Sequence, residues 1–271
     1  MPASGTAANP DPGPTISVQL PPRPYLKDYN RKLPASEQKS TEGIRVFLDA
    51  CDIREKVFVH EQRACPVSHH LDTDDARSVH LVIYAPPPSP TSDLESESEQ
   101  SKSIPVGTLR IIPYPHQPHP LPYSHSDPPS ADAEVEDAST FFFKSPPKYQ
   151  VDRKTTFHDG VEPYLILGRL CLLKEYRRKR YANLLIQEAV NWAKEHPNFA
   201  KDQLSDEEKE GIPEWNGLIG LHAREERVKT WARNGFEVDE KMRAWFQADI
   251  RHVGMFRRVC LLYTSPSPRD S

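Results

Sequence analysis

Apolar residues recur with two different periods along this chain, and these periods predict strands and helices. Five runs are short and mostly apolar, or alternate with polar residues, as is typical of strands: 15–20, 78–85, 105–112, 165–173 and 217–223. After residue 181 the apolar positions share one helical face: Ala182, Leu185, Ile186, Ala189, Val190 and Ala193. The pattern predicts a strand, a tight turn and a helix between residues 165 and 194.

Helical spacing also occurs before residue 62 and after residue 223. Thr41 is a candidate N-cap for a helix that reaches Cys51, and a second helical segment covers residues 53–62. A helix over 224–234 would end at Gly235. With last strands at 236–239 and 252–256, the expected order is β, α, α, β, β, β, α, β, α, β, β.

Proline-rich stretches interrupt this pattern and limit the chain to one folded domain. Hydrophobic residues are 37% of the chain, and proline is 28 of 271 residues, about twice its usual share. We expect a mostly disordered segment over 1–40, one domain over 41–259, and disordered insertions at about 86–104, 113–160 and 198–213. Within the last insertion, Ser205 and Glu208 predict a capping box. Residues 260–271 resemble a translated transposase sequencing adapter and are set apart from the fold.

Charge and cysteine content exclude several classes of protein. The formal charge is 35 minus 39, or −4, so no overall basic field would attract nucleic acid. No apolar run approaches the length of a membrane span, and the first residues lack a secretory pattern. The four cysteines form no C-x-x-C pair. We expect a protein of the cytoplasm or nucleus that binds neither membranes nor nucleic acid, with its oligomeric state open.

Four cations stand where the strand after residue 165 turns into the next helix: Arg177, Arg178, Lys179 and Arg180. The positive end of a helix dipole repels cations, so this cluster favours a bound anion such as a pyrophosphate. A solvated turn or a nuclear-localisation patch is the alternative reading. The position at a strand-to-helix junction favours the anion site.

The same residues carry a family resemblance. Leu170-Cys-Leu-Leu-Lys-Glu-Tyr-Arg-Arg-Lys-Arg-Tyr-Ala182 resembles the acyl-CoA signature of the GNAT superfamily of N-acetyltransferases, with Arg180 at its middle glycine. Upstream, Arg54-Glu-Lys-Val-Phe-Val-His-Glu-Gln62 resembles a segment of a branch well populated in fungi. Later segments resemble the closing elements of that branch: Leu221-His-Ala-Arg224, Asn234-Gly-Phe236 and Ile250-Arg-His-Val-Gly-Met255.

This resemblance implies a fold and a co-substrate. The fold would be a mixed α/β (α+β) GNAT arrangement, with a mostly antiparallel sheet splayed at its central strands and flanked by helices. Acetyl-CoA would be the co-substrate, its pantetheine arm along the open strand edge and its pyrophosphate at the basic turn. The implied cofactor-binding residues are Leu170, Leu172, Arg177, Arg178, Lys179, Arg180, Tyr181, Ala182 and Arg224.

The acceptor amine must lose a proton before it attacks, so a base is expected near the slot. The resemblance makes Glu61 the first candidate and His252 the second catalytic candidate, while His80, Asp72 and Asp75 are weaker. The tyrosine that often protonates the departing thiolate in this superfamily is replaced here by Trp231, which cannot act as an acid. Water would then supply that proton.

No metal is expected. His116, His119 and His125 fall in a proline-rich stretch that predicts no fixed ligand geometry, and residue 64 is alanine, so no H-E-x-x-H helix begins at His60. Hydrolase, Walker and dinucleotide motifs are absent from the sequence.

The sequence therefore predicts an acetyl-CoA-dependent N-acetyltransferase that acts by direct transfer in a ternary complex on a small-molecule or peptide amine. Two alternatives stay open. One is an acyl-CoA-binding module without turnover, suggested by Arg180 and Trp231, and the other is a nuclear interaction protein that uses residues 177–180 as a basic patch.

Overall fold

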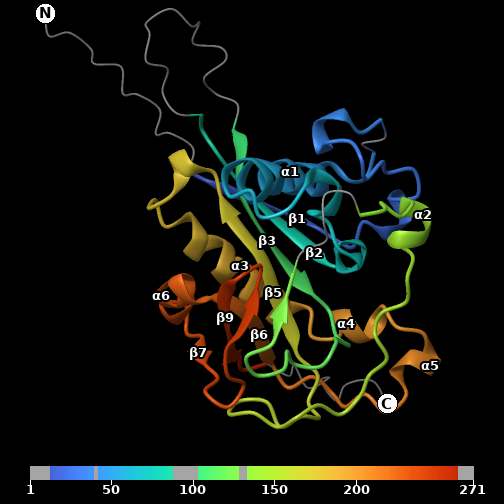
Figure 1. Cartoon of the computed structure of the whole chain (residues 1–271), viewed down its shortest axis with the longest axis vertical. Coiled ribbons are helices and arrows are strands. Elements are labelled where there is room, and N and C mark those ends of the chain that lie inside the picture. The colour runs from blue at the N-terminus through green and yellow to red at the C-terminus, as the bar shows by residue number, and fades with distance from the viewer. Residues whose placement is uncertain (1–12, 40–41, 88–102, 128–132, 262–271) are drawn as a thin grey trace, which may run out of the picture.

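The computed structural model describes residues 13–39, 42–87, 103–127 and 133–261. In these residues the strands form one sheet in the order β1-β2-β3-β5-β6-β9-β8-β4, with β7 paired to β9 (Figure 1). The strands are β1 (Thr15–Gln19), β2 (Val79–Ala85), β3 (Ile104–Ile112), β4 (His125–Ser126), β5 (Leu165–Leu172), β6 (Leu218–Arg224), β7 (Glu237–Val238), β8 (Trp245–Gln247) and β9 (Ile250–Arg258). The α-helices are α1 (Arg45–Arg54), α2 (Ala138–Phe141), α3 (Tyr181–Glu195), α4 (Phe199–Asp202), α5 (Asp206–Lys209) and α6 (Val228–Ala232).

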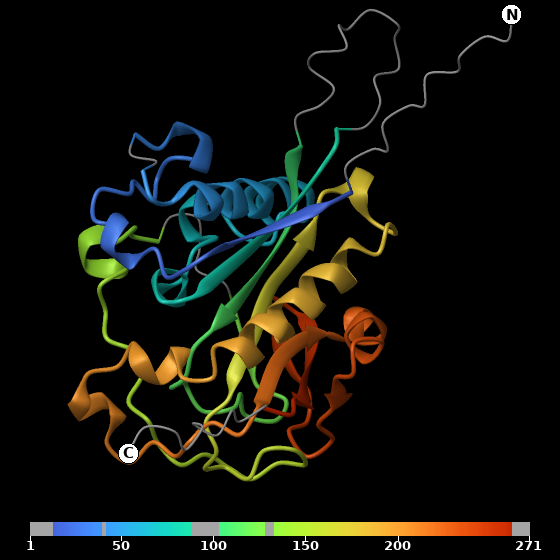
Figure 2. The same cartoon turned by 180° about the vertical axis from the view of Figure 1, so that it is seen from behind.

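Helices cover both faces of the sheet because its central strands carry apolar side chains on both faces. In β2, Leu81 and Ile83 belong to the core cluster that contains the buried face of α3. Val82, between them, belongs to a second cluster that contains Ala50 and Ile53 of α1. Figure 2 shows α3, drawn in yellow to orange, lying across one face of the sheet. The alternation along β2 thus assigns one helix to each face.

The two central strands separate. Strands β5 and β6 are parallel and pair only over Leu165–Leu167 and Ile219–Leu221. Beyond these residues β5 stays paired with β3 and β6 stays paired with β9. The facing edges of the two strands therefore diverge. The other described strand pairs are antiparallel, except the short parallel pair of β4 and β8 at the edge of the sheet. The predicted mixed, mostly antiparallel sheet, splayed at its centre and flanked by helices, is confirmed.

A β-bulge lies in β5 at the start of this divergence. Thr108 of β3 is opposite Cys171 and Arg110 is opposite Gly168, so the single residue between the first pair faces two residues of β5. One of these two, Arg169, has a φ of 57°. A bulge bends its strand and redirects a side chain, and here the Arg169 side chain, 37% exposed, reaches the carboxylate of Asp72 at 2.6 Å.

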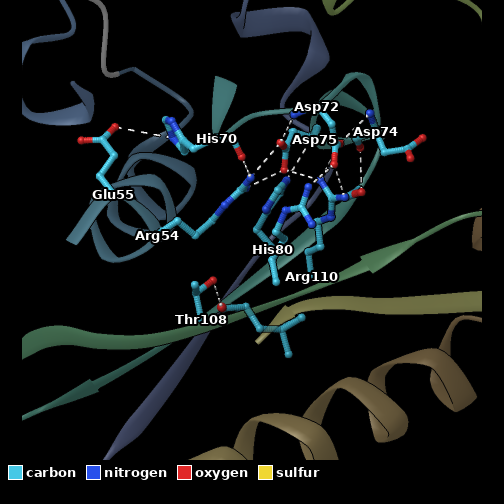
Figure 3. A network of polar contacts seen from close by, with 12 residues as sticks. Arg54, Glu55, His70, Asp72, Asp74, Asp75, His80, Thr108 and Arg110 are labelled. Carbon is cyan, nitrogen blue, oxygen red and sulfur yellow. Dashed lines mark hydrogen bonds and ion pairs between the residues drawn. The ribbon is translucent and has the colours of Figure 1, made fainter. Parts of the chain in front are cut away.

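A buried ionic network fixes α1 and the following loop to the sheet (Figure 3). Asp75 accepts hydrogen bonds from Arg54 of α1 at 2.6 and 3.0 Å and from Arg110 of β3 at 2.6 Å. Arg110 also donates twice to Asp72, at 2.7 and 2.6 Å. Burial opposes the ionisation of Asp75, but Arg110 and Arg54 outweigh it and hold its pKa well below the usual range.

Most predicted elements are present, with different ends. Helix α3 buries the expected face, and both bonds of the Ser205–Glu208 capping box form. Gly235 follows α6 with a φ of 78°. Thr41 lies outside the described residues, and α1 begins at Arg45 without a side-chain cap. The second helical segment is not separate, because α1 continues directly into wider π-helical turns over Glu55–Glu61.

The proline-rich insertion at 113–160 differs most from the expectation of disorder. Residues 113–127 and 133–160 have defined positions, and β4 pairs with β8 within this region. The carboxylate of Asp239 accepts a hydrogen bond from the Thr155 hydroxyl at 2.6 Å and from the N–H groups of Thr156 and Phe157, both at 2.9 Å. Such contacts join positions more than 80 residues apart, so local sequence patterns cannot predict them.

Candidate active site

The divergence of β5 and β6 opens two facing strand edges. From Gly168 to Leu172, β5 has no strand partner on the β6 side among the described residues. Leu170 and Leu172, which were predicted to border the pantetheine arm, lie half-buried on this edge. A free strand edge presents backbone donors and acceptors in a fixed row, so it can pair with the amides of an extended ligand.

The predicted anion site lies at the start of α3. Among the described residues, the backbone N–H groups of residues 178–182 have no hydrogen-bond acceptor, and α3 has no side-chain cap at Arg180. Arg180 has a φ of 65°, which is the left-handed conformation that glycine adopts most easily, and Arg178 has a φ of 66°. The turn thus takes a glycine-type backbone although its sequence offers arginine. Free N–H groups at a helix N-terminus form a site for a phosphate group.

Arg177 and Glu61 are in direct contact. The Arg177 guanidinium donates to both oxygens of Glu61, at 2.7 and 2.6 Å, and its Nε donates to the carbonyl of Leu172 at 3.0 Å. The side chain is 34% exposed and that of Glu61 is 38% exposed. The hydrogen bonds from Arg177 lower the pKa of Glu61. The predicted base, Glu61, and the predicted phosphate ligand, Arg177, therefore form an ion pair with each other.

The other basic side chains of the turn stay nearer the solvent. Arg178, Lys179 and Arg180 are exposed, and Lys179 Nζ lies 5.0 Å from the centre of the Tyr176 ring. The Tyr176 ring lies roughly parallel to that of Tyr181, with centroids 6.4 Å apart. The predicted phosphate ligands from Arg177 to Ala182 thus gather around one helix start.

A second group of predicted residues lies on the β6 side. Arg224 at the end of β6 stands opposite His252 of β9 in the strand register. His252 is mostly buried, and its Nδ1 lies 2.8 Å from the carbonyl of Ile250, so Nδ1 carries the hydrogen. The hydrogen bonds in the described residues join neither of these two side chains to Glu61. The two predicted catalytic residues are therefore in separate groups.

His222 and Trp245 were not predicted. His222 is the first residue of β6 after its pairing with β5 ends, and it is the exposed residue in an otherwise mostly buried strand. Its ring packs edge-on against Trp245, with centroids 4.7 Å apart. Desolvation by the surrounding protein, with repulsion from His119 and His252, lowers the pKa of His222 to about 3. The ring is thus exposed where the two strands diverge and packs against Trp245.

The remaining candidates have structural partners. His80 is buried, and its Nε2 lies 2.8 Å from the carbonyl of Asp75, while Asp72 and Asp75 are engaged in the network of Figure 3. Trp231 is buried in the main core and packs edge-on against Phe236 at 5.5 Å.

No family model matches this sequence, and no curated protein matches it. Among solved structures, the chain is similar to a presumed N-acetyltransferase from Lactobacillus plantarum, at 16% identity and a TM-score of 0.44, over 93% of this chain and 100% of that chain. It is also similar to ElaA from Escherichia coli and to an acyl-CoA N-acyltransferase from Pseudomonas aeruginosa. Each of these shows 14% identity and a TM-score of 0.43, over 90% of this chain and 99% of the other. With TM-scores below 0.5, these likenesses carry no residue's role to this chain.

No helix in the described part of the chain is long and apolar enough to cross a membrane.

Proposed function

We propose that this protein is an acetyl-CoA-dependent N-acetyltransferase of the GNAT type, of the branch that the segment at 54–62 resembles. One observation carries the proposal: the open edge of β5 is followed, after a short 3-10 turn, by a helix start whose N–H groups have no acceptor among the described residues. An extended arm ending in a diphosphate matches both features at once. The resemblance of residues 170–182 to the acyl-CoA signature supports the same ligand.

Acetyl-CoA would lie with its pantetheine amides along Leu170 and Leu172 and its pyrophosphate at the N–H groups of residues 178–182. The thioester would then stand near the bulge, between Arg169 and His222. A backbone N–H of the open edge would polarise its carbonyl, because donors fixed in place stabilise the negative charge that develops on the oxygen. Arg224 is the further candidate for a phosphate or nucleotide contact.

Binding of this ligand would compete with the ion pair between Arg177 and Glu61. The pyrophosphate carries more negative charge than a carboxylate and accepts bidentate hydrogen bonds from arginine. Once Arg177 turns to the phosphate, Glu61 loses the hydrogen bonds that lower its pKa. The carboxylate is then free to accept a proton, so co-substrate binding prepares the base.

The chemistry is a direct transfer in a ternary complex. The acceptor ammonium loses a proton to Glu61, directly or through water, and the neutral nitrogen attacks the thioester carbonyl. The C–S bond then breaks, the attacking nitrogen releases its second proton to water, and that water protonates the CoA thiolate, because Trp231 cannot supply a proton. His252, with its lone pair on Nε2, is the other candidate proton acceptor, on the opposite side. The acceptor is a small-molecule amine or a peptide amine, in the cytoplasm or nucleus.

Calorimetry with CoA tests the binding step. Arg177→Glu should weaken CoA binding by about 10-fold or more, because charge-assisted hydrogen bonds contribute roughly 1.5–3 kcal/mol. Lys194→Glu is the matched control, since it makes the same charge change at the other end of α3 and should leave the affinity unchanged. Equal affinity in both variants would reject the phosphate site, and the absence of CoA binding in the wild type would favour a nuclear interaction protein.

Thiol release from acetyl-CoA with a panel of amines tests turnover. A transferase releases CoA in an amine-dependent manner, whereas a binding module without turnover binds CoA but releases none. The panel should include small amines, amino sugars, polyamines and peptide N-termini, because the acceptor side is formed by loops that vary between proteins. The amine that gives the highest kcat/KM identifies the acceptor class.

A further inference from the structure

A second cluster of reactive side chains lies outside the proposed active site, in the proline-rich insertion. His119, Asp152 and His158 each offer one ligand atom, and these atoms all lie within 4.8 Å of one another. The two histidines are 3% and 4% exposed, and the Asp152 side chain is 12% exposed. Two imidazoles and a carboxylate that converge away from solvent form a common ligand set for zinc.

The hydrogen bonds around the cluster direct its lone pairs inward. His158 Nε2 lies 2.8 Å from the carbonyl of Glu162, so Nε2 carries the hydrogen and Nδ1 keeps the lone pair. That Nδ1 lies 2.8 Å from Nε2 of His119. A ligand histidine whose second nitrogen donates to a backbone carbonyl is the usual arrangement around zinc, since the carbonyl fixes the ring and its tautomer.

The other two ligands keep the capacity to bind a cation. Each oxygen of Asp152 accepts one backbone N–H, from Arg153 and from His119, both at 2.6 Å, so each retains a lone pair. A neutral His119 ring can carry its hydrogen on Nδ1, which leaves the lone pair of Nε2, 2.8 Å from Nδ1 of His158, for a metal ion. Nδ1 of His119 lies 3.2 Å from the Tyr164 hydroxyl.

The surroundings suit a structural metal. Tyr164 and Phe256 pack against both histidine rings, with centroid distances between 5.0 and 6.3 Å, and so hold the two rings in place. The ligands come from segments without helix or strand, which reach the sheet through few backbone bonds. A metal that cross-links such segments supplies stability that their own backbone does not.

We propose that His119, Asp152 and His158 form a zinc site that ties together two segments of the proline-rich insertion, one at residue 119 and one at residues 152–158. Zinc takes the place of the hydrogen shared between the two rings: the proton on His119 Nε2 moves to Nδ1, where Tyr164 accepts it, and Nε2 becomes a ligand. Water completes the coordination. Sequence reasoning missed this site because Asp152 is 33 residues from His119 and does not belong to the histidine tract at 116–125.

The test uses the full chain, purified without a histidine tag, and ZnCl2 as the probe. We expect one zinc per chain after removal of free metal, and a Tm higher by about 5–10 °C at a hundredfold excess of zinc over its Kd. His119→Ala and His158→Ala should each lower zinc affinity at least about 10-fold. His125→Ala is the matched control, because this exposed histidine of the same insertion stacks on Phe246 away from the cluster and should leave binding unchanged.

X-ray absorption on the wild-type protein keeps the test independent of variant folding. It should show two imidazole nitrogens and a carboxylate oxygen at about 2.0–2.2 Å from zinc. The proposal is overturned if the wild type retains no zinc, if sulfur ligands are found, or if folded His119→Ala and His158→Ala proteins retain zinc as the wild type does. None of these outcomes depends on CoA binding, so they leave the proposed acetyltransfer untouched.

Discussion

The contact between Glu61 and Arg177 makes a specific prediction about co-substrate binding. Glu61→Gln removes the charge that holds Arg177, so CoA should bind about 2–5-fold more tightly, since an exposed ion pair contributes roughly 0.2–1 kcal/mol. The same change removes the proposed base, so kcat should fall by about 100-fold. Calorimetry and steady-state kinetics measure the two effects separately.

Glu195→Gln is the control for that experiment, because it neutralises an exposed carboxylate at the far end of α3. It should change neither value. Weaker CoA binding in Glu61→Gln would contradict the competition, and an unchanged kcat would move the role of base to His252.

Glu55 makes a prediction about stability and pH. Burial raises its pKa to about 7, and its Oε1 lies 3.5 Å from His70 Nε2, a buried nitrogen without a hydrogen-bond partner (Figure 3). Nδ1 of His70 faces the carbonyl of Val67 at 2.6 Å, so Nε2 carries a lone pair that a protonated Glu55 can meet. Between pH 4.5 and 7 the folded state therefore binds more protons at Glu55 than the unfolded state does.

This contribution to stability is fully present below about pH 4.5 and is lost as the pH rises through 7. Burial lowers the pKa of His70 to about 4, which acts in the opposite direction in part of the same range. We therefore compare the wild type with Glu55→Gln. As the pH falls from 7 to 5, the unfolding free energy of the wild type should rise relative to that of Glu55→Gln, by up to about 1.4 kcal/mol per pH unit. Urea titrations at three pH values would show it, and parallel curves would contradict the assignment.

At the scale of the helices, strands and turns, the turn that precedes α3 is under backbone strain at Arg180. Arg180 has a φ of 65°, which costs an L-residue about 1–2 kcal/mol, while glycine adopts it freely but loses roughly 0.5–1 kcal/mol more entropy on folding. Arg180→Gly should therefore raise the free energy of unfolding by up to about 1 kcal/mol. Lys179→Gly, at a neighbouring residue without a positive φ, should lower it by a similar amount. Urea denaturation measures both, and equal losses in both variants would contradict the strain.

The secondary-structure elements show which features nearby residues in the sequence could predict and which they could not. The helical face of α3, the strands β2, β3 and β5 and the Ser205–Glu208 capping box follow from residues near each other in sequence, so they could be predicted. The bulge at Arg169 could not, because it depends on the register of β5 against β3. His222 was missed for a related reason: its exposure arises only because β5 and β6 stop pairing at the preceding residue.

Across the whole molecule, polar contacts between distant residues fix the segments whose structure the local sequence patterns did not predict. The insertion expected to be disordered is held by Asp239 and by the cluster of His119, Asp152 and His158, whose members come from distant segments. The network around Asp75 likewise joins α1, the following loop, β3 and the bulge of β5. The sequence suggested Asp72, Asp75 and His80 as weak catalytic candidates. Their contacts in the structure show that they take part in this network instead.

Removal of one member of this network tests its role in joining the parts. Arg54 is fully buried, and Arg54→Ala would leave Asp75 with a buried charge short of two hydrogen bonds, so the free energy of unfolding should fall by about 3–5 kcal/mol. Lys56→Ala, which removes an exposed ion pair two residues later, should cost less than about 1 kcal/mol. Chemical denaturation followed by tryptophan fluorescence measures both. Arg54 and Asp75 lie on the α1 side, whereas the fluorescence comes from four tryptophans elsewhere in the fold: Trp192, Trp215, Trp231 and Trp245. If the fluorescence transition of Arg54→Ala moves to lower denaturant in a single step, the network couples the whole sheet. An unchanged fluorescence transition would limit the role of the network to α1 and the loop after it.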